Sequence, residues 1–165
     1  MIPPPIRAFI GLGANVGEVE TTLTEAMWAI DSLPQTSIRA QSKFYRTPPW
    51  GLLDQPEFIN AVVEVQTRLV PRILLNYLLD VETRFGRERS EGEKWGPREL
   101  DLDLLIFGDE QIDMPGMHLP HPHLHERAFV LVPLAEIAAA LEIPGLGKVS
   151  DLLAKVDATG IDPID

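Results

Sequence analysis

The order in which helix-like and strand-like segments alternate is the strongest constraint on how this 165-residue chain can fold. Apolar side chains recur at three- and four-residue spacing over residues 19–30 and again over residues 74–85, which predicts two amphipathic helices. Pro34 marks the end of the first helix, and Pro71 and Gly86 bound the second. Strand-like segments lie before, between and after the helices, at residues 6–12, 38–45, 59–66 and 100–107.

This order, strand, helix, strand, strand, helix, strand, is the split βαβ arrangement. We therefore expect an α+β, ferredoxin-like fold, with a mainly antiparallel sheet and both helices on one face. A C-terminal extension follows, in which residues 129–141 mix helix and strand signals around Pro133 and residues 150–156 resemble a short capped helix. We expect both segments to pack on the same core. Because no repeat or linker divides the chain, residues 1–165 are predicted to form a single domain.

Composition excludes several classes of protein. The chain has no cysteine, so it has neither disulfides nor thiolate metal ligands, which suits a reducing compartment. The first residues carry no basic leader before an apolar run, and the longest apolar region, residues 128–146, is interrupted by prolines and acids. A net charge of −11 argues against a general nucleic-acid binder. We therefore expect a cytoplasmic protein with no membrane partner and no nucleic-acid partner.

One window of the chain is basic although the whole is acidic. Residues 84–98 hold five of the 14 basic residues of the chain, against three acids. Guanidinium and ammonium groups gathered in this way favour a cradle for a small polyanion such as a nucleoside triphosphate. A solvated helix end and loop is the alternative. The five basic residues are Arg84, Arg87, Arg89, Lys94 and Arg98.

Two aspartates one residue apart are the sharpest local feature. Side chains alternate on a strand, so Asp101 and Asp103 are expected to share one face while Leu102 points into the core. Two neighbouring carboxylates repel each other unless a cation lies between them, and Mg²⁺ prefers such oxygen ligands. An exposed strand face with two solvated acids is the alternative. Just before the pair, Trp95 and Arg98 flank a stiff turn that offers an aromatic ring and a guanidinium. Taken by itself, Trp95 is better explained as a side chain that packs this loop onto the core.

All four histidines of the chain fall between residues 118 and 125, which raises the alternative of a zinc site. They lack the one-turn spacing of a helical histidine pair, but a proline-rich extended segment could place His121, His123 and His125 on one face. A zinc-dependent hydrolase is therefore a rival interpretation. We prefer a loop histidine that contacts a substrate phosphate, with His123 and His125 left in solvent.

Gly11, Gly13 and Gly17 follow a strand and precede a helix, as in a dinucleotide-binding fingerprint. The third glycine falls one position late, and the next strands look antiparallel. The acid roughly 20 residues on, Asp31, lies inside the first helix rather than after a second strand. A dinucleotide-binding dehydrogenase is therefore disfavoured, and Asn15 is expected to cap the helix.

Several separate motifs together resemble one known family. They lie at residues 44–49, 54–56, 58–61, 95–98, 100–103, 119–121 and 126–129. In this combination they are similar to the motifs of 6-hydroxymethyl-7,8-dihydropterin pyrophosphokinases, and the similarity extends from residue 11 to about residue 141. The resemblance implies an enzyme of folate biosynthesis that moves the pyrophosphoryl group of ATP to the pterin hydroxymethyl group and releases AMP.

The resemblance also implies roles for individual residues. Asp101 and Asp103 correspond to ligands of two Mg²⁺ ions that bridge the triphosphate and the attacking hydroxyl. Arg87 and Arg98 correspond to loop arginines that hold phosphates in the transition state. The positions that correspond to further ATP contacts are Lys94, His121 and Arg127.

The pterin site implied by the resemblance is built mainly from aromatic rings. Phe58 and Phe129 would lie on either side of the pterin, and Asn60 would bind its polar edge. The remaining contacts would come from backbone groups of Thr47 and Pro48 and from the ring of Trp95, which would close over the ligand.

Four positions depart from the family pattern. Phe58 replaces a tyrosine, which keeps the stacking ring and loses a hydroxyl. Pro122 stands where an aromatic residue often follows the histidine, and His118 and Gly116 replace a threonine and an arginine near the nucleotide. Both aspartates and both loop arginines are retained, so we expect an active enzyme that uses Mg²⁺, ATP and the dihydropterin. We also expect it to be a monomer. An inactive relative that senses a pterin or a nucleotide is the alternative.

Overall fold

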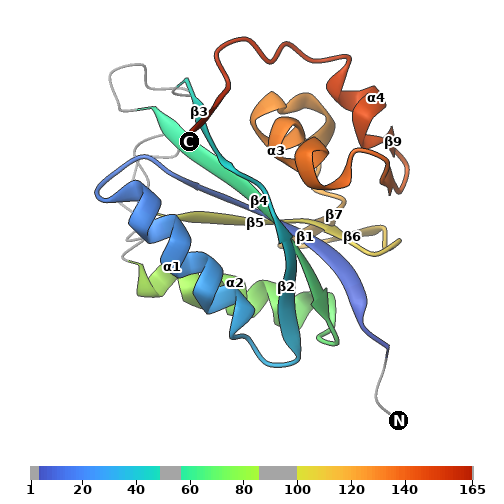
Figure 1. Cartoon of the computed structure of the whole chain (residues 1–165). Helices are drawn as coiled ribbons and strands as arrows, with labels where there is room; N and C mark the ends of the chain where they lie inside the picture. The colour runs from blue at the N-terminus through green and yellow to red at the C-terminus, as the bar shows by residue number, and fades with distance from the viewer. Residues whose placement is uncertain (1–3, 49–56, 86–99, 165) are drawn as a thin grey trace.

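The computed structural model describes residues 4–48, 57–85 and 100–164. Its main feature is one six-stranded sheet, made of β1 (Ile6–Ala14), β2 (Thr36–Gln41), β3 (Phe44–Thr47), β4 (Phe58–Thr67), β5 (Asp101–Phe107) and β10 (Asp162–Ile164). The strand order is β10-β3-β4-β1-β5, and β2 also pairs with β4 (Figure 1). The strand pairs of this sheet are antiparallel, and β1 lies between β4 and the edge strand β5.

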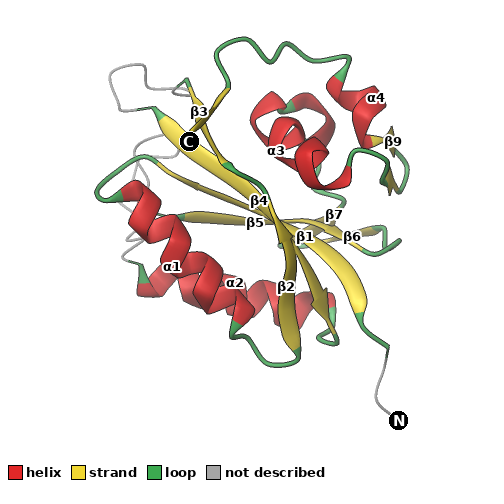
Figure 2. Cartoon of the chain, viewed as in Figure 1, coloured by secondary structure: helices red, strands yellow, loops and turns green. Residues whose placement is uncertain are grey.

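Helices cover both faces of the sheet (Figure 2). On one side lie α1 (Val19–Asp31) and α2 (Pro71–Arg84), and on the other lie α3 (Ala128–Ala138) and α4 (Val149–Leu153). The predicted split βαβ fold, with its first two helices on one face, is confirmed. No helix within the described ranges is long and apolar enough to cross a membrane. The smaller elements are β6 (Ile112–Met114), β7 (Met117–Leu119), a 3-10 turn (Leu124–Glu126), β8 (Glu142–Ile143) and β9 (Gly147–Lys148).

The strand predicted over residues 38–45 is two strands, β2 and β3, because the chain bends at Ser42. The Ser42 N–H donates to the Val62 carbonyl at 2.9 Å, and its hydroxyl oxygen accepts from the Val62 N–H at 3.0 Å. A side chain thus replaces one backbone partner of the ladder. As a result β2 pairs with the second half of β4 and β3 with the first half. A second local difference is the start of α1, where Glu18 occupies the N-cap position and Asn15 is buried upstream of it.

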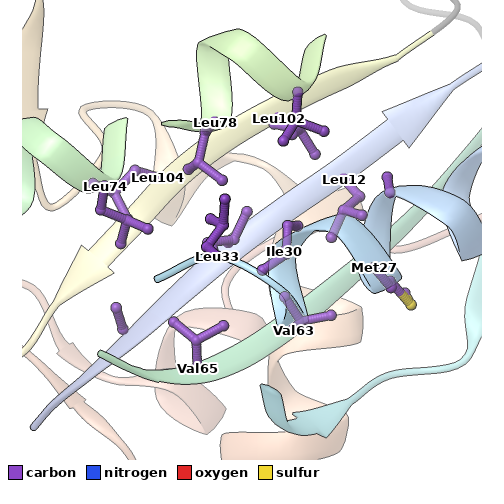
Figure 3. Packing of buried hydrophobic residues seen from close by; sticks show 14 of the residues in the cluster. Leu12, Met27, Ile30, Leu33, Val63, Val65, Leu74, Leu78, Leu102 and Leu104 are labelled. Atoms are coloured by element: carbon purple, nitrogen blue, oxygen red, sulfur yellow. The ribbon is translucent and has the colours of Figure 1, made fainter. Parts of the chain in front are cut away.

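The larger core lies between the sheet and the α1 and α2 helices. Leucines of β1 and β5 point to this face and meet leucines and isoleucines of the two helices (Figure 3). Each fully buried side chain of this kind stabilises the fold by roughly 1.5–3 kcal/mol relative to an exposed one. Examples of these packed side chains are Leu12, Leu102, Ile30, Leu74 and Leu78.

A second, separate cluster lies on the opposite face. Phe9, Val62 and Leu105 of the sheet pack against Leu131 and Leu134 of α3 there. The expectation that the C-terminal segments join the first core is therefore wrong, because they pack on the other side of the sheet. The mixed signal around Pro133 has the same origin, since a helix buried between a sheet and α4 is apolar on most of its surface.

Glu136 ties α3 to the sheet. Its carboxylate accepts hydrogen bonds from the Tyr45 hydroxyl at 2.6 Å and from the Lys43 backbone N–H at 3.0 and 3.2 Å. Burial, together with the hydrogen bond and the charge of Glu136, raises the pKa of Tyr45 from 10.0 to about 12. These contacts hold the second half of α3 beside β3.

Substitutions at this contact are expected to weaken the fold to different degrees. Tyr45→Phe removes one hydrogen bond and lowers the free energy of unfolding by about 0.5–1.5 kcal/mol. Glu136→Ala lowers it further, because two donors lose their acceptor. The raised pKa of Tyr45 means that its contribution is present below pH 10 and is lost as pH rises from 10 to about 12. Urea unfolding measures both effects, and identical midpoints for the wild type and both variants would contradict the contact.

Candidate functional site

Asp101 and Asp103 lie side by side on the sheet face opposite α1 and α2. Both are half-buried on β5, where Asp101 pairs with Gly13 of β1 and Asp103 pairs with Gly11. Leu102, between them, is buried in the first cluster. The two acids thus share one face, as the alternation of the strand predicts, and the neighbouring strand places no side chain next to either of them.

Asn60 lies in the same row across the sheet. Gly13 pairs with Asp101 on one side and with Asn60 of β4 on the other, and directly paired residues point to the same face. Strands are about 4.8 Å apart, so Asn60 and Asp101 are about 10 Å apart with a glycine between them. No side chain of β1 therefore stands between the Asn60 amide on one side and the two carboxylates on the other.

A short chain of hydrogen bonds orients the Asn60 amide. Its Nδ2 donates to Thr47 Oγ1 at 2.9 Å, and the Thr47 hydroxyl donates to the Phe58 carbonyl at 3.4 Å. Because the hydroxyl proton is used on Phe58, the threonine oxygen accepts, so it is the nitrogen of the amide that faces Thr47. Phe58, two residues before Asn60 on β4, is half-buried on the same face, and Pro48 is exposed.

Arg127 and Phe129 lie at the beginning of α3. Arg127 is the N-cap residue, and its guanidinium carbon is 5.6 Å from the centre of the Phe129 ring. This distance allows a cation–π contact, which orients both groups. Both side chains are half-buried, and Phe129 packs against the second cluster. The structure thus gives the predicted cation and the predicted ring a fixed position at one end of α3.

His121 is held beside β5 by its backbone. Its N–H donates to the Leu105 carbonyl at 2.8 Å, and its ring Nδ1 accepts from the His123 N–H at 3.3 Å. The remaining ring proton is therefore on Nε2. Burial first, and then the charges of Arg127, His123 and His118, lower the pKa of His121 from 6.5 to about 4. At neutral pH this side chain is an uncharged donor through Nε2, which can bind an anionic oxygen.

The other histidines take part in separate contacts. His118 Nδ1 is 2.6 Å from Asp113 Oδ1 on the β6–β7 ribbon, and His123 and His125 both lie near Glu126. His123 is exposed, as expected, whereas His125 is half-buried. In the part of the chain that the structure describes, no three histidine, aspartate or glutamate side chains converge as metal ligands. The geometry of these residues therefore offers no support for the zinc alternative.

Magnesium needs fewer protein ligands than a zinc site. Mg²⁺ is commonly bound by one or two protein carboxylates, and its other positions are taken by water and phosphate oxygens. Asp101 and Asp103 supply two carboxylates from one strand, half-buried and on one face. This set of oxygen donors fits magnesium together with a phosphate ligand.

Glu82 is a residue of this region that the sequence reasoning missed. It lies on α2, its side chain is 3% exposed, and its Oε2 accepts a hydrogen bond from the Leu102 N–H at 2.6 Å. Leu102 is the residue between the two aspartates, and its N–H points away from β1 to the outer edge of β5. A signal was present in the sequence, because Glu82 follows Leu78 by four residues and so falls on the apolar stripe of the helix.

Four residues implied by the resemblance lie outside the described ranges. They are Arg87, Lys94, Trp95 and Arg98, and their roles stay predictions.

Comparison with known proteins gives one consistent result. A model of the family described as 7,8-dihydro-6-hydroxymethylpterin-pyrophosphokinase matches residues 9–139. A Methylorubrum extorquens protein named 2-amino-4-hydroxy-6-hydroxymethyldihydropteridine pyrophosphokinase is 43% identical over 96% of this chain and 99% of its own length. A protein of the same name from Pseudomonas aeruginosa is 40% identical over 94% of this chain and 95% of its own length.

Solved structures with a similar fold include an HPPK-DHPS in complex with substrates, with a TM-score of 0.70 and 13% identity. A wild-type HPPK-DHPS of Plasmodium falciparum also has a TM-score of 0.70, with 14% identity. Each covers 92% of this chain, which spans only 43% and 41% of their lengths. At these identities the likeness concerns the fold alone.

The lowered pKa of His121 can be measured directly. An NMR titration of the imidazole is expected to give a midpoint near 4 in place of 6.5. Arg127→Gln removes one of the charges but not the burial, so the midpoint should move part of the way back up. Because the unfolded chain takes up this proton at higher pH than the folded one, His121 makes the fold less stable as pH falls from 6.5 to about 4. A midpoint at or above 6.5 would contradict the geometry.

The contact between Glu82 and β5 gives a second prediction. Glu82→Ala removes the acceptor of a buried N–H and is expected to lower the free energy of unfolding by about 1–3 kcal/mol. Asp80→Ala is the matched control, since Asp80 is an exposed acid on the same helix and its loss should change stability by less than about 0.5 kcal/mol. Equal effects of the two substitutions in urea unfolding would show that the Glu82 contact is unimportant.

Proposed function

The chain belongs to the 7,8-dihydro-6-hydroxymethylpterin-pyrophosphokinase family, and from this premise we propose that it transfers the pyrophosphoryl group of ATP to 6-hydroxymethyl-7,8-dihydropterin. The products are AMP and the pterin diphosphate, and the step belongs to folate biosynthesis. The observation that carries the proposal is the row of Asn60, Gly13 and Asp101, which places an amide and a carboxylate pair on one face of the sheet with no side chain of β1 between them.

In the proposed reaction the pterin hydroxymethyl oxygen attacks the β-phosphorus of ATP. A bond forms between these atoms, the bond from the β-phosphorus to the oxygen bridging to the α-phosphate breaks, and AMP leaves. Phosphoryl groups under attack are shielded by their own negative oxygens, so catalysis depends mainly on alignment and on neutralising charge. No strong base is needed for this reaction.

Asp101 and Asp103 would hold magnesium, with two ions proposed from the resemblance. Bound magnesium would neutralise phosphate charge and align the phosphates with the hydroxyl. Beside it, the Nε2 proton of His121 would donate to a phosphate oxygen, and the Arg127 guanidinium would bind the same polyanion. Arg87, Arg98 and Lys94 would add positive charge, as the resemblance implies.

The pterin would lie beside the Asn60 amide. Phe58 and Phe129 would stack on its two faces, and the Asn60 amide would bind its polar edge, held in place by Thr47. Pro48 and Trp95 would complete the pocket. We further propose that the enzyme acts in the cytoplasm as a monomer on these two small molecules, without a nucleic-acid partner, which agrees with its net charge of −11.

An AMP-release assay with ATP, the dihydropterin and Mg²⁺ tests the proposal. Asp101→Asn and Asp103→Asn keep the shape of each side chain and remove its charge, so turnover should fall roughly a hundredfold or more. Asp80→Asn is the control, because Asp80 is an exposed acid on α2 and is not among the proposed site residues. Its turnover should equal that of the wild type. Thermal unfolding should show that both aspartate variants remain folded.

The wild type should lose activity when magnesium is chelated and regain it when magnesium alone is returned. Near-normal AMP release by either aspartate variant would refute the assigned roles, and absence of AMP release by the wild type would refute the proposed reaction.

A further inference from the structure

The backbone conformation at Gly13 does not require a glycine. It lies in β1, one residue before the strand ends, where it is paired on both sides, and it is not among the glycines with positive φ. Glycine in a strand interior lowers stability relative to alanine, because the unfolded chain loses more freedom on folding. The reason for glycine at this position must therefore lie in the space beside it.

That space is occupied by the Asn60 side chain. A β-carbon placed on Gly13 would lie 2.5 Å from Asn60 Oδ1, closer than β-carbons approach other atoms in proteins. Gly11 is on the same strand and the same face, but a β-carbon there would meet Leu105 Cδ1 at 3.4 Å, an ordinary contact. Of these two glycines, only Gly13 is required by the position of a polar side chain.

The Asn60 oxygen is not free to turn away without loss. Asn60 is 9% exposed, and its nitrogen donates to Thr47 Oγ1 at 2.9 Å. The Thr47 hydroxyl in turn donates to the Phe58 carbonyl, so the amide cannot reverse and keep this bond. With the nitrogen directed to Thr47, the oxygen is directed to the space above Gly13. A side chain at position 13 would therefore displace the whole amide.

We propose that Gly13 is a positioning residue for pterin recognition, and that it acts through the Asn60 amide. This inference rests on the proposed function. With glycine at position 13, Asn60 keeps its oxygen and its second N–H available as a neighbouring acceptor and donor. That pair complements the amide-like edge of an aminopyrimidinone ring, which also carries a donor beside an acceptor. Gly13 thereby determines specificity for the heterocycle and has no direct effect on ATP.

The test compares Gly13→Ala with Gly11→Ala as the matched control. Titrations measure the Kd of 6-hydroxymethyl-7,8-dihydropterin and, separately, the Kd of a nonhydrolysable ATP analogue with Mg²⁺. Gly13→Ala is expected to raise the pterin Kd roughly tenfold or more, the effect of losing about one hydrogen bond to a buried polar group. If Gly13 acts only through Asn60, the Kd of the ATP analogue for Gly13→Ala should stay within about twofold of the wild-type value. The pterin Kd of Gly11→Ala should also stay within about twofold of the wild-type value.

A double-substitution cycle separates action through Asn60 from a general structural effect. Asn60→Ala removes the amide and with it the contact that excludes a β-carbon at position 13. Adding Gly13→Ala to Asn60→Ala should therefore cause no further increase in the pterin Kd beyond about twofold. Thermal unfolding of all the variants controls for folding, and a crystal structure of Gly13→Ala should show the Asn60 amide turned away from Thr47.

The outcomes distinguish this inference from the proposed function. If the wild type binds the dihydropterin and Gly13→Ala binds it equally well, the inference is wrong while the proposed function stands. The inference is also wrong if both glycine variants weaken pterin binding alike, or if Gly13→Ala has its full effect without Asn60. If the wild type neither binds the dihydropterin nor releases AMP, the proposed function itself fails. If Gly13→Ala does not fold, the double variant with Asn60→Ala is expected to fold. If the double variant also fails to fold, Gly13 has a general structural role and the inference is wrong.

Discussion

The register of β1 between β4 and β5 is the constraint on which the rest of the structure depends. It aligns Gly13 with Asn60 on one side and with Asp101 on the other. Burial of the alternate residues fixes this register, because Leu12 and Leu102 face the first core while Phe9 faces the second. A slip by one residue would turn every side chain of a strand to the opposite face. The hydrophobic cores on the two faces therefore hold the polar row in place.

The two faces of the sheet are covered by different helices. One face is covered by α1 and α2. On the other face α3 packs over Phe9, Val62 and Leu105, and the site residues lie near the first residues of β4 and β5. The chain as a whole is acidic, yet the proposed ligand is a triphosphate. In the proposed complex the phosphate charge would be neutralised locally, by Arg127, by the Nε2 proton of His121 and by magnesium held on the two aspartates.

The sequence was sufficient to predict what depends on periodicity and on short motifs. The α1, α2, β4 and β5 elements and the common face of Asp101 and Asp103 follow from spacing alone. The bend at Ser42 could not be predicted, because it depends on a side chain that replaces a backbone partner 20 residues away. The placement of α3 on the opposite face was also missed, since an almost uniformly apolar segment does not indicate which surface covers it.

A crystal structure with a nonhydrolysable ATP analogue, the dihydropterin and Mn²⁺ in place of Mg²⁺ tests most directly whether this row is where the substrates meet. Anomalous scattering would locate the metal independently of the protein. We expect a metal about 2.1 Å from an oxygen of each of Asp101 and Asp103, with the polar edge of the pterin ring on the Asn60 amide. Metal and pterin bound elsewhere, with both aspartates turned to solvent, would contradict it.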